Sequence, residues 1–298
     1  MKKIALVHLV RSRNGIEPLK RFLDSYLRNP GEIEHELLII FKGFNSSREL
    51  SLYRDVLAGT PYREMSAPDI GFDIGSYMIA FQAFRHEYPY FCFTNSFSEI
   101  LHPGWLELLY RHASRPEVGL VGATGSYQSI SSGAEYPTYS FMKNISPLKS
   151  FLVKPFLACL HYYRSRYFMR FPNPHIRTNG FMLPSSVMDT LQVGRMRRKM
   201  DAYYFESGRN GLTQQILRMG KKALIVGADG IGYDIPEWYR SNTFWLGDQK
   251  NLLISDNQTR AYAQSELIMK IRYSYYAWRE DAWPNATALQ SEAPPTAL

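Results

Sequence analysis

One stretch constrains the fold of this chain more than any other: residues 88–106, which read YPYFCFTNSFSEILHPGWL. It opens with an aromatic run at residues 90–93, which is typical of a buried strand. Residues 102–104 break the strand, and Trp105 begins an amphipathic helix. Between them lie four small polar residues: Thr94, Asn95, Ser96 and Ser98. Because open α/β sheets bind ligands where a strand ends beside a helix, the stretch predicts an α/β fold with a binding site at this strand end.

The surrounding sequence alternates between strand-like and helix-like segments. Strands are predicted at residues 4–10, 34–41, 118–124, 179–184 and 221–227, with a short extended piece at residues 61–65. Helices are predicted at residues 18–26, 49–57, 78–86, 105–113 and 213–219. This order is typical of a mostly parallel sheet that is flanked by helices.

The length of 298 residues and the apolar content of 45% are sufficient for one large α/β domain. Cys92 and Cys159 each lie in an apolar run, so both are expected to be buried small hydrophobes, as in a reducing compartment. The first ten residues lack the cleavage site of a signal peptide, and no window holds the roughly 18 apolar residues of a membrane-spanning helix. We therefore expect a cytoplasmic protein.

The formal net charge of +8 implies anionic partners. Nucleic acid, the diphosphate of a nucleotide-sugar and an anionic membrane surface are all allowed by charge alone. The sequence has no helix-turn-helix, zinc or RNP-type signature, so no nucleic acid partner is expected. The 21 tyrosines are suited to stacking on sugars or to lying at lipid headgroups.

A second motif precedes the predicted helix at residues 78–86: residues 69–77 read DIGFDIGSY. Gly71 and Gly75 flank Asp73 and allow the backbone to approach a ligand closely. The start of the following helix offers free N–H groups to an anion. The alternative is that Asp73 is a helix N-cap and that the glycines serve a turn. The sequence leaves both interpretations open.

These motifs, in this order, resemble the GT-A glycosyltransferases. In that pattern an apolar strand is followed by Asp-x-Asp, an acidic or polar pair and Pro-Gly-Trp-Leu, which stands here at residues 103–106. Residues 69–77 resemble the Gly-x-Asp-x-Gly-x-Tyr segment of family 2-like bacterial polysaccharide transferases, including the rhamnan-synthesis type, where the segment lies near the nucleotide. The resemblance implies a Rossmann-like GT-A domain at residues 1–234.

The activity that this resemblance implies is transfer of a sugar from a UDP-, dTDP- or GDP-sugar donor to a glycan or lipid-linked glycan acceptor. The pathway would be the synthesis of a bacterial surface polysaccharide such as O-antigen or capsule. The two metal-binding aspartates of the pattern fall on Asn95 and Phe97, and a hard divalent cation needs anionic oxygens. We therefore expect an enzyme with no essential metal cofactor. A non-catalytic partner subunit that binds a glycan or another transferase is the alternative.

The resemblance also implies a general base. In inverting GT-A enzymes an acidic residue opens the helix that lies across the acceptor site, and here Glu206 precedes the helix predicted at residues 213–219. The usual Glu-Asp pair is reduced to Glu206 and Ser207, so Glu206 is the candidate catalytic base. The alternative is that Glu206 is only a carboxylate favoured by the dipole at a helix start.

The other candidate site residues fall into two groups. The expected donor-binding residues are His8, Lys42, Asp69, Gly71, Asp73, Ser76, Asn95 and Ser96. The expected acceptor- or diphosphate-binding residues are Glu99, Arg177, Asn179 and Arg209. His175 is interpreted as structural, and Glu99 has the alternative of a surface carboxylate.

Residues 141–177 form a predicted insertion in which every charged side chain is basic. One interpretation is extra core with a solvated basic face. The other is contact with the inner face of the cytoplasmic membrane, with aromatic side chains at the headgroups and basic side chains on anionic lipid. After the GT-A-like domain, residues 235–290 are expected to form a helical extension and residues 291–298 a disordered tail.

Overall fold

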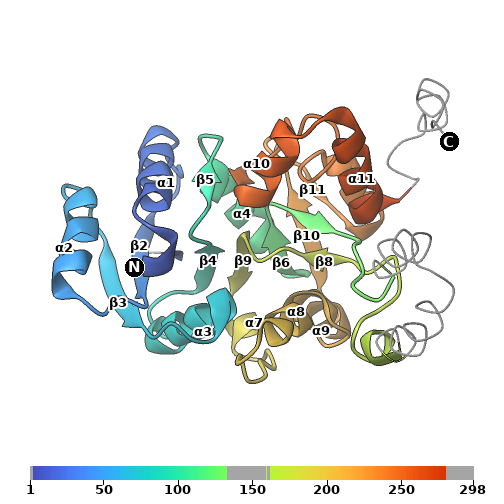
Figure 1. Cartoon of the computed structure of the whole chain (residues 1–298), viewed down its shortest axis with the longest axis horizontal. Coiled ribbons are helices and arrows are strands. Elements are labelled where there is room, and N and C mark those ends of the chain that lie inside the picture. Colours follow the sequence, from blue (N-terminus) through green and yellow to red (C-terminus); the bar gives the residue numbers. More distant parts are fainter. Residues whose placement is uncertain (1–2, 133–158, 160–161, 280–298) are drawn as a thin grey trace, which may run out of the picture.

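The computed structural model describes residues 3–132, 159 and 162–279, and it centres on an eight-stranded sheet with the order β11-β10-β6-β9-β4-β1-β2-β3 (Figure 1). The strands are β1 (Ile4–Arg11), β2 (His35–Lys42), β3 (Arg63–Ala67), β4 (Tyr90–Thr94), β6 (Val118–Gly122), β9 (Gly180–Pro184), β10 (Lys222–Val226) and β11 (Gly232–Tyr233). β1, β2, β3 and β4 pair in parallel, as do β6 and β10. The predicted α/β class with a mostly parallel sheet is therefore confirmed.

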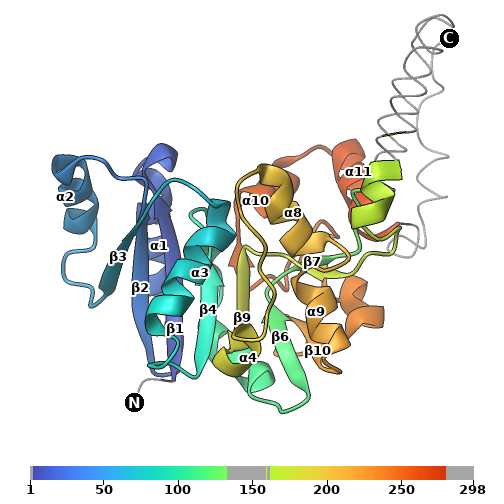
Figure 2. The ribbon, with the colours of Figure 1, turned by 90° about the horizontal axis from the view of Figure 1, so that it is seen from below.

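Helices cover both faces of the sheet (Figures 1 and 2). One face carries α1 (Glu17–Arg28), α2 (Ser47–Val56) and α4 (Trp105–Ala113), and the other carries α3 (Phe72–Phe84), α7 (Ser185–Met188), α8 (Lys199–Ser207) and α9 (Leu212–Arg218). Successive strand residues point to opposite faces, so β1 supplies both cores. Leu6 packs in the α1 core and Val7 in the α3 core.

β9 runs against its neighbours, and this direction positions part of the site. It pairs antiparallel with both β4 and β6, and Gly180 at its start lies opposite Thr94 at the end of β4. The residues just before β9 are therefore brought to the edge where the parallel strands end. The sequence predicted this strand but not its direction, because strand direction depends on contacts that are distant in the chain.

The chain after residue 234 packs back on the sheet domain. It forms η2 (Ile235–Ser241), β12 (Ile254–Ser255), α10 (Asn257–Gln264) and α11 (Leu267–Trp278). β12 pairs antiparallel with β5 (Glu99–Ile100), and Trp238, Tyr262 and Trp278 are buried in the same core as α3. A further short pair, β7 (Gly125–Ser126) with β8 (His175–Ile176), lies between the sheet and this extension.

Three expectations from the sequence need correction or fall outside the description. The helix predicted from residue 78 is α3, and it begins earlier, at Phe72. Gly71 adopts φ 75° at the helix N-cap, a conformation that glycine reaches without strain, and Gly75 is part of the helix. Cys92 is buried as expected, but Cys159 is exposed. Residues 141–158 of the predicted insertion and the expected tail at residues 291–298 lie outside the described residues.

No helix among the described residues combines the length and the apolar character that crossing a membrane requires.

Candidate functional site

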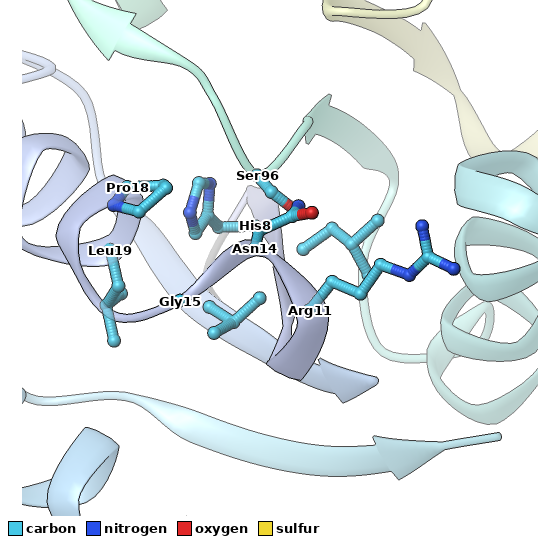
Figure 3. Close-up of a pocket in the computed structure, with 9 residues that line it drawn as sticks. His8, Arg11, Asn14, Gly15, Pro18, Leu19 and Ser96 are labelled. Atoms are coloured by element: carbon cyan, nitrogen blue, oxygen red, sulfur yellow. The ribbon is translucent and has the colours of Figure 1, made fainter. Parts of the chain in front are cut away.

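The candidate site lies at the carboxyl ends of β1 and β4. From β1 the strand order continues to β2 and β3 on one side and to β4 on the other, so the chain diverges between β1 and β4. Open α/β sheets bind ligands in the crevice outside such a point of divergence. His8, Asn14 and Ser96 line a shallow depression there. In Figure 3 the Arg11 side chain extends away from the His8 ring.

His8 is fully buried beside the end of β4. Its ring stacks on Phe22 with 3.5 Å between ring centroids, and burial lowers its pKa to about 3, so it is neutral near pH 7. Thr94 Oγ1 donates its proton to the Val7 carbonyl and lies 3.0 Å from His8 Nδ1, so Nδ1 must be the donor to Thr94. His8 Nε2 is then a bare acceptor, and it has no partner among the described residues.

Asp69, which follows β3, binds Arg11 at the end of β1 and so links the ends of these two strands. Its carboxylate accepts two hydrogen bonds from Arg11, with Nε–Oδ1 at 2.7 Å and Nη2–Oδ2 at 3.0 Å. These bonds hold the pKa of Asp69 below its usual value. Gly43 is required beside the pair, because a Cβ at that position would come within 2.8 Å of Asp69 Cβ. The ion pair therefore fixes the loop that leads into α3.

Asp73 lies in the first turn of α3 above a buried lysine. Lys42 is 1% exposed, and its Nζ donates to the Phe72 carbonyl. Loss of hydration raises the pKa of Asp73, the cations Lys42 and Arg11 oppose that rise, and the charge of Glu206 adds to it. Asp73, Lys42 and Glu206 thus share one electrostatic environment at this edge of the sheet.

Glu206 reaches the same edge from the other side of the site. It lies in the last turn of α8 and precedes α9, the helix predicted at residues 213–219. The alternative of a carboxylate at a helix start is therefore wrong. Glu206 Oε1 accepts hydrogen bonds from Thr178 N at 3.0 Å and Thr178 Oγ1 at 3.2 Å. Thr178 stands just before β9, so the antiparallel strand sets the position of the carboxylate. The charge of Glu206 also opposes the burial effect that lowers the pKa of His175.

Asn95 and Phe97, at the positions of the Asp-x-Asp motif, do not fit a divalent cation. Asn95 Oδ1 accepts a hydrogen bond from Phe97 N at 2.9 Å and one from Ser98 Oγ at 3.3 Å, so it caps a turn. Phe97 has no ligand atom in its side chain. Among the residues that the structure describes, no three His, Cys, Asp or Glu side chains are grouped so that they could hold a metal ion.

Two buried polar residues at the edge complete the described site. Asn179 Oδ1 accepts from Thr124 Oγ1 at 2.7 Å, while its Nδ2 is buried without a partner among the described residues. Ser76 is buried, and its hydroxyl donates back to the Phe72 carbonyl at 3.3 Å. Asn179 therefore has a donor to spare, whereas Ser76 is occupied within its own helix.

Three of the predicted acceptor or diphosphate residues have other partners. Glu99 Oε2 lies 3.2 Å from Arg260 Nη1 of α10. Arg177 is buried against the C-terminal extension, where Nη1 donates to Gln258 at 2.9 Å and Nη2 lies 3.4 Å from Asp256. Arg209 donates from Nε and Nη2 to the Ser165 carbonyl at 3.2 and 3.1 Å. These side chains hold parts of the chain together.

The sequence did not single out Arg11 or Thr178 as functional. Arg11 had a usable signal, because it directly follows an apolar strand and its charge must lie at the strand end. Thr178 had none, because its contact with Glu206 depends on the direction of β9.

No protein-family model matches this chain, and no curated protein matches it by sequence. Three solved structures are similar to it at low identity. A 4-diphosphocytidyl-2C-methyl-D-erythritol synthase from Anaerococcus prevotii is 12% identical, with a TM-score of 0.40 over 68% of this chain and 83% of its own. A mannosyltransferase from Pyrobaculum calidifontis, solved with GDP-mannose and Mn²⁺, is 13% identical, with a TM-score of 0.45 over 100% of this chain and 76% of its own.

The third structure is glucosyl-3-phosphoglycerate synthase from Mycobacterium tuberculosis, solved with Mn²⁺, UDP and phosphoglyceric acid. It is 13% identical, with a TM-score of 0.35 over 64% of this chain and 58% of its own. The functional proposal below rests on the residues of the site.

Proposed function

We propose that this chain is an inverting glycosyltransferase that moves a sugar from a nucleotide-sugar donor to a hydroxyl of a glycan acceptor in bacterial surface polysaccharide synthesis. One observation carries the proposal: α3, with Asp73 in its first turn, packs against α8, with Glu206 in its last turn, beside the edge of the sheet where β1 and β4 diverge. This edge is where a ligand would bind in an open α/β sheet. The resemblance to GT-A enzymes, which covers roughly residues 3–234, supplies the reaction class.

Glu206 is the proposed general base. Thr178 engages Oε1, and Oε2 has no hydrogen-bond partner among the described residues, so one oxygen is held while the other can accept a proton. A carboxylate in the last turn of a helix faces the negative end of the helix dipole, so helix stability does not explain this residue. The base would take the proton of the acceptor hydroxyl as its oxygen attacks the anomeric carbon.

Asp73 and His8 are proposed to bind the donor nucleotide. A carboxylate and a neutral imidazole nitrogen both accept hydrogen bonds, as a ribose hydroxyl or a base N–H requires. Asp73 stands at the start of α3, and His8 Nε2 is a buried acceptor without a partner among the described residues. UDP-, dTDP- and GDP-sugars are the donor classes to be distinguished.

A non-catalytic partner subunit remains the second candidate, and a specific observation favours it. The side chains at positions 95 and 97 cannot hold the metal that the GT-A pattern provides, and Asn95 is committed to a turn. A subunit that binds a glycan or another transferase would require this fold but would not require catalytic residues. The two candidates differ in whether Glu206 matters for turnover.

Substitution of Glu206 by glutamine tests the proposal directly. Glu206→Gln keeps the size and the hydrogen bonds to Thr178 but cannot accept the acceptor proton. We expect turnover to fall by about a hundredfold to ten-thousandfold, with little change in donor affinity. Glu117→Gln is the matched control, because Glu117 is an exposed carboxylate at the opposite end of the strands, where it pairs with Arg115. Turnover of Glu206→Gln near that of the control would remove Glu206 from the mechanism.

We also propose that the segment at residues 162–170 contacts an anionic membrane surface. Tyr162, Tyr163 and Tyr167 are exposed there, at 67%, 44% and 41%. Arg164, Arg166 and Arg170 alternate with them along the chain. Aromatic side chains beside cations suit the headgroup layer of an anionic membrane.

A further inference from the structure

The loop between α7 and α8, together with the first residue of α8, carries a dense group of positive charges. Arg195, Arg197, Arg198 and Lys199 fall within five consecutive residues, and all four are exposed. Their side-chain nitrogens make no ion pair with the described part of the chain, although Lys199 Nζ lies 5.5 Å from the centroid of the Tyr203 ring. We call these four residues the basic loop.

Asp201 holds the backbone of the basic loop and does not pair with the basic side chains, which stay free to bind a ligand. Asp201 Oδ2 accepts hydrogen bonds from Arg197 N at 2.8 Å and Arg198 N at 2.7 Å. A carboxylate that binds two backbone amides holds the chain at the start of α8. The loop is therefore anchored, and its guanidinium groups face solvent.

The basic loop lies against the proposed donor site. A Cβ placed on Gly71 would come within 3.6 Å of both Cβ and O of Met196, so the loop backbone packs on the turn that begins α3. Figures 1 and 2 both show α3 and α8 side by side. Glu206 follows Lys199 by seven residues on α8, a rise of about 10 Å along the helix axis. The loop thus lies beside the turn that begins α3, next to Asp73, and at the end of α8 opposite to Glu206.

Two other cations at this edge, Arg11 and Lys42, are already engaged in hydrogen bonds, and the exposed Arg13 lies near the carboxylate that Arg11 binds. Arg11 makes its two hydrogen bonds to Asp69, and Arg13 lies 3.9 Å from the same carboxylate. Lys42 is buried and donates to the Phe72 carbonyl. Positions 95 and 97 supply no carboxylate for a metal. An anionic ligand bound here would therefore find its available positive charge in the basic loop.

We propose that the basic loop binds the diphosphate of the nucleotide-sugar donor, an inference that rests on the function proposed above. In the transfer, the acceptor oxygen forms a bond to the anomeric carbon, and its proton goes to Glu206. The bond from the anomeric carbon to the diphosphate oxygen breaks, and its electron pair stays on the leaving nucleoside diphosphate. Arginine side chains stabilise that charge through charge-assisted hydrogen bonds to phosphate oxygens.

The test compares nucleoside diphosphate binding by the wild-type chain and three variants of the full chain in calorimetric titrations with UDP, dTDP and GDP. The test variant carries Arg195→Gln, Arg197→Gln and Arg198→Gln. The matched control carries Lys3→Gln, Arg28→Gln and Arg272→Gln, three exposed cations outside the described site, so both variants lose three positive charges. A third form with lysine at positions 195, 197 and 198 keeps the charge. Circular dichroism melting establishes that each form is folded.

For the nucleotide that the wild-type chain binds best, we expect the test variant to lose about tenfold to a hundredfold in affinity. The control should bind like wild type, the lysine form should retain most of the affinity, and binding of the corresponding nucleoside should be equal in all forms. Wild-type affinity in the glutamine variant would overturn this inference and leave the proposed function standing. A wild-type chain that binds none of the three nucleotides would overturn the proposed function itself.

Discussion

Asp69 shows how a residue beside the site can serve the architecture. Its two hydrogen bonds to Arg11 tie the end of β1 to the loop after β3, and they lower its pKa. A carboxyl whose pKa is lower in the folded state adds stability at pH values above its unfolded pKa. That contribution is lost as the pH falls through the folded value.

We therefore expect Asp69→Asn to be less stable than the wild-type chain at pH 7. The difference should shrink as the pH falls below the ordinary aspartate value of 3.8, because the wild-type carboxylate then becomes protonated. Thermal unfolding of both proteins across this pH range measures the effect. A stability difference that does not depend on pH would show that the ion pair is not its source.

For single residues, the sequence indicates which strand ends and motifs carry candidate side chains, but it does not indicate the contacts of those side chains. Lys42, Asp73 and Asn95 lie at predicted strand ends or in the glycine motif, and the structure places them near one edge of the sheet together with His8. Their exposure was not predictable. Lys42 is buried under the start of α3, because that helix begins six residues earlier than the sequence pattern indicates.

Among the elements, the start of α3 and the direction of β9 are the features that the sequence patterns did not predict. Gly71 and Gly75 are poor helix formers, so propensity favours a loop where the packed structure has a helix. β9 was predicted as a strand, but its antiparallel direction comes from pairing with β4 and β6. That direction places Thr178 and Asn179 at the site, and no local pattern contains it.

Arg177 links the segment between β8 and β9 to the start of α10. Its guanidinium lies 4.1 Å from the centroid of the Phe244 ring and pairs with Asp256, which is 1% exposed. Arg177→Ala leaves a buried carboxylate without its cation, so we expect a loss of about 3 kcal/mol in the free energy of unfolding.

Denaturant unfolding measures the effect of Arg177→Ala, with Lys222→Ala as the control. Lys222 forms an exposed pair with Asp234, and its loss should cost at most about 1 kcal/mol. Equal losses in the two variants would contradict a special role for the buried contact.

The segment at residues 162–170 makes a prediction of its own. The chain should co-sediment with liposomes of anionic lipid more than with neutral ones, because each cation near such a surface is worth about 1 kcal/mol. Charge reversal at Arg164, Arg166 and Arg170 should remove the difference, while reversal at Lys3, Arg28 and Arg272 should leave it largely intact. Equal co-sedimentation with anionic and neutral liposomes would contradict the membrane contact and favour a solvated basic face.

For the whole molecule, the order of strands and helices was predictable because each apolar run is short and bounded by turn residues. The helix at residues 105–113 was predicted with the bounds of α4. The packing of the C-terminal extension could not be predicted from the sequence, because Trp238, Tyr262 and Trp278 are buried against elements that are distant in the chain. The proposed pairing of Asp73 with Glu206 likewise depends on the packing of α3 against α8, two helices that are distant in the sequence.

The central claim is that a nucleotide-sugar binds at the edge of the sheet where β1 and β4 diverge. Calorimetric titration of the wild-type chain with UDP-, dTDP- and GDP-sugars, in the presence of EDTA, tests it most directly. We predict that one donor class binds with a dissociation constant between about 1 μM and 1 mM, the range typical of enzyme substrates. Asp73→Asn should weaken that binding by about tenfold. A folded wild-type chain that binds none of the three donors would contradict the claim.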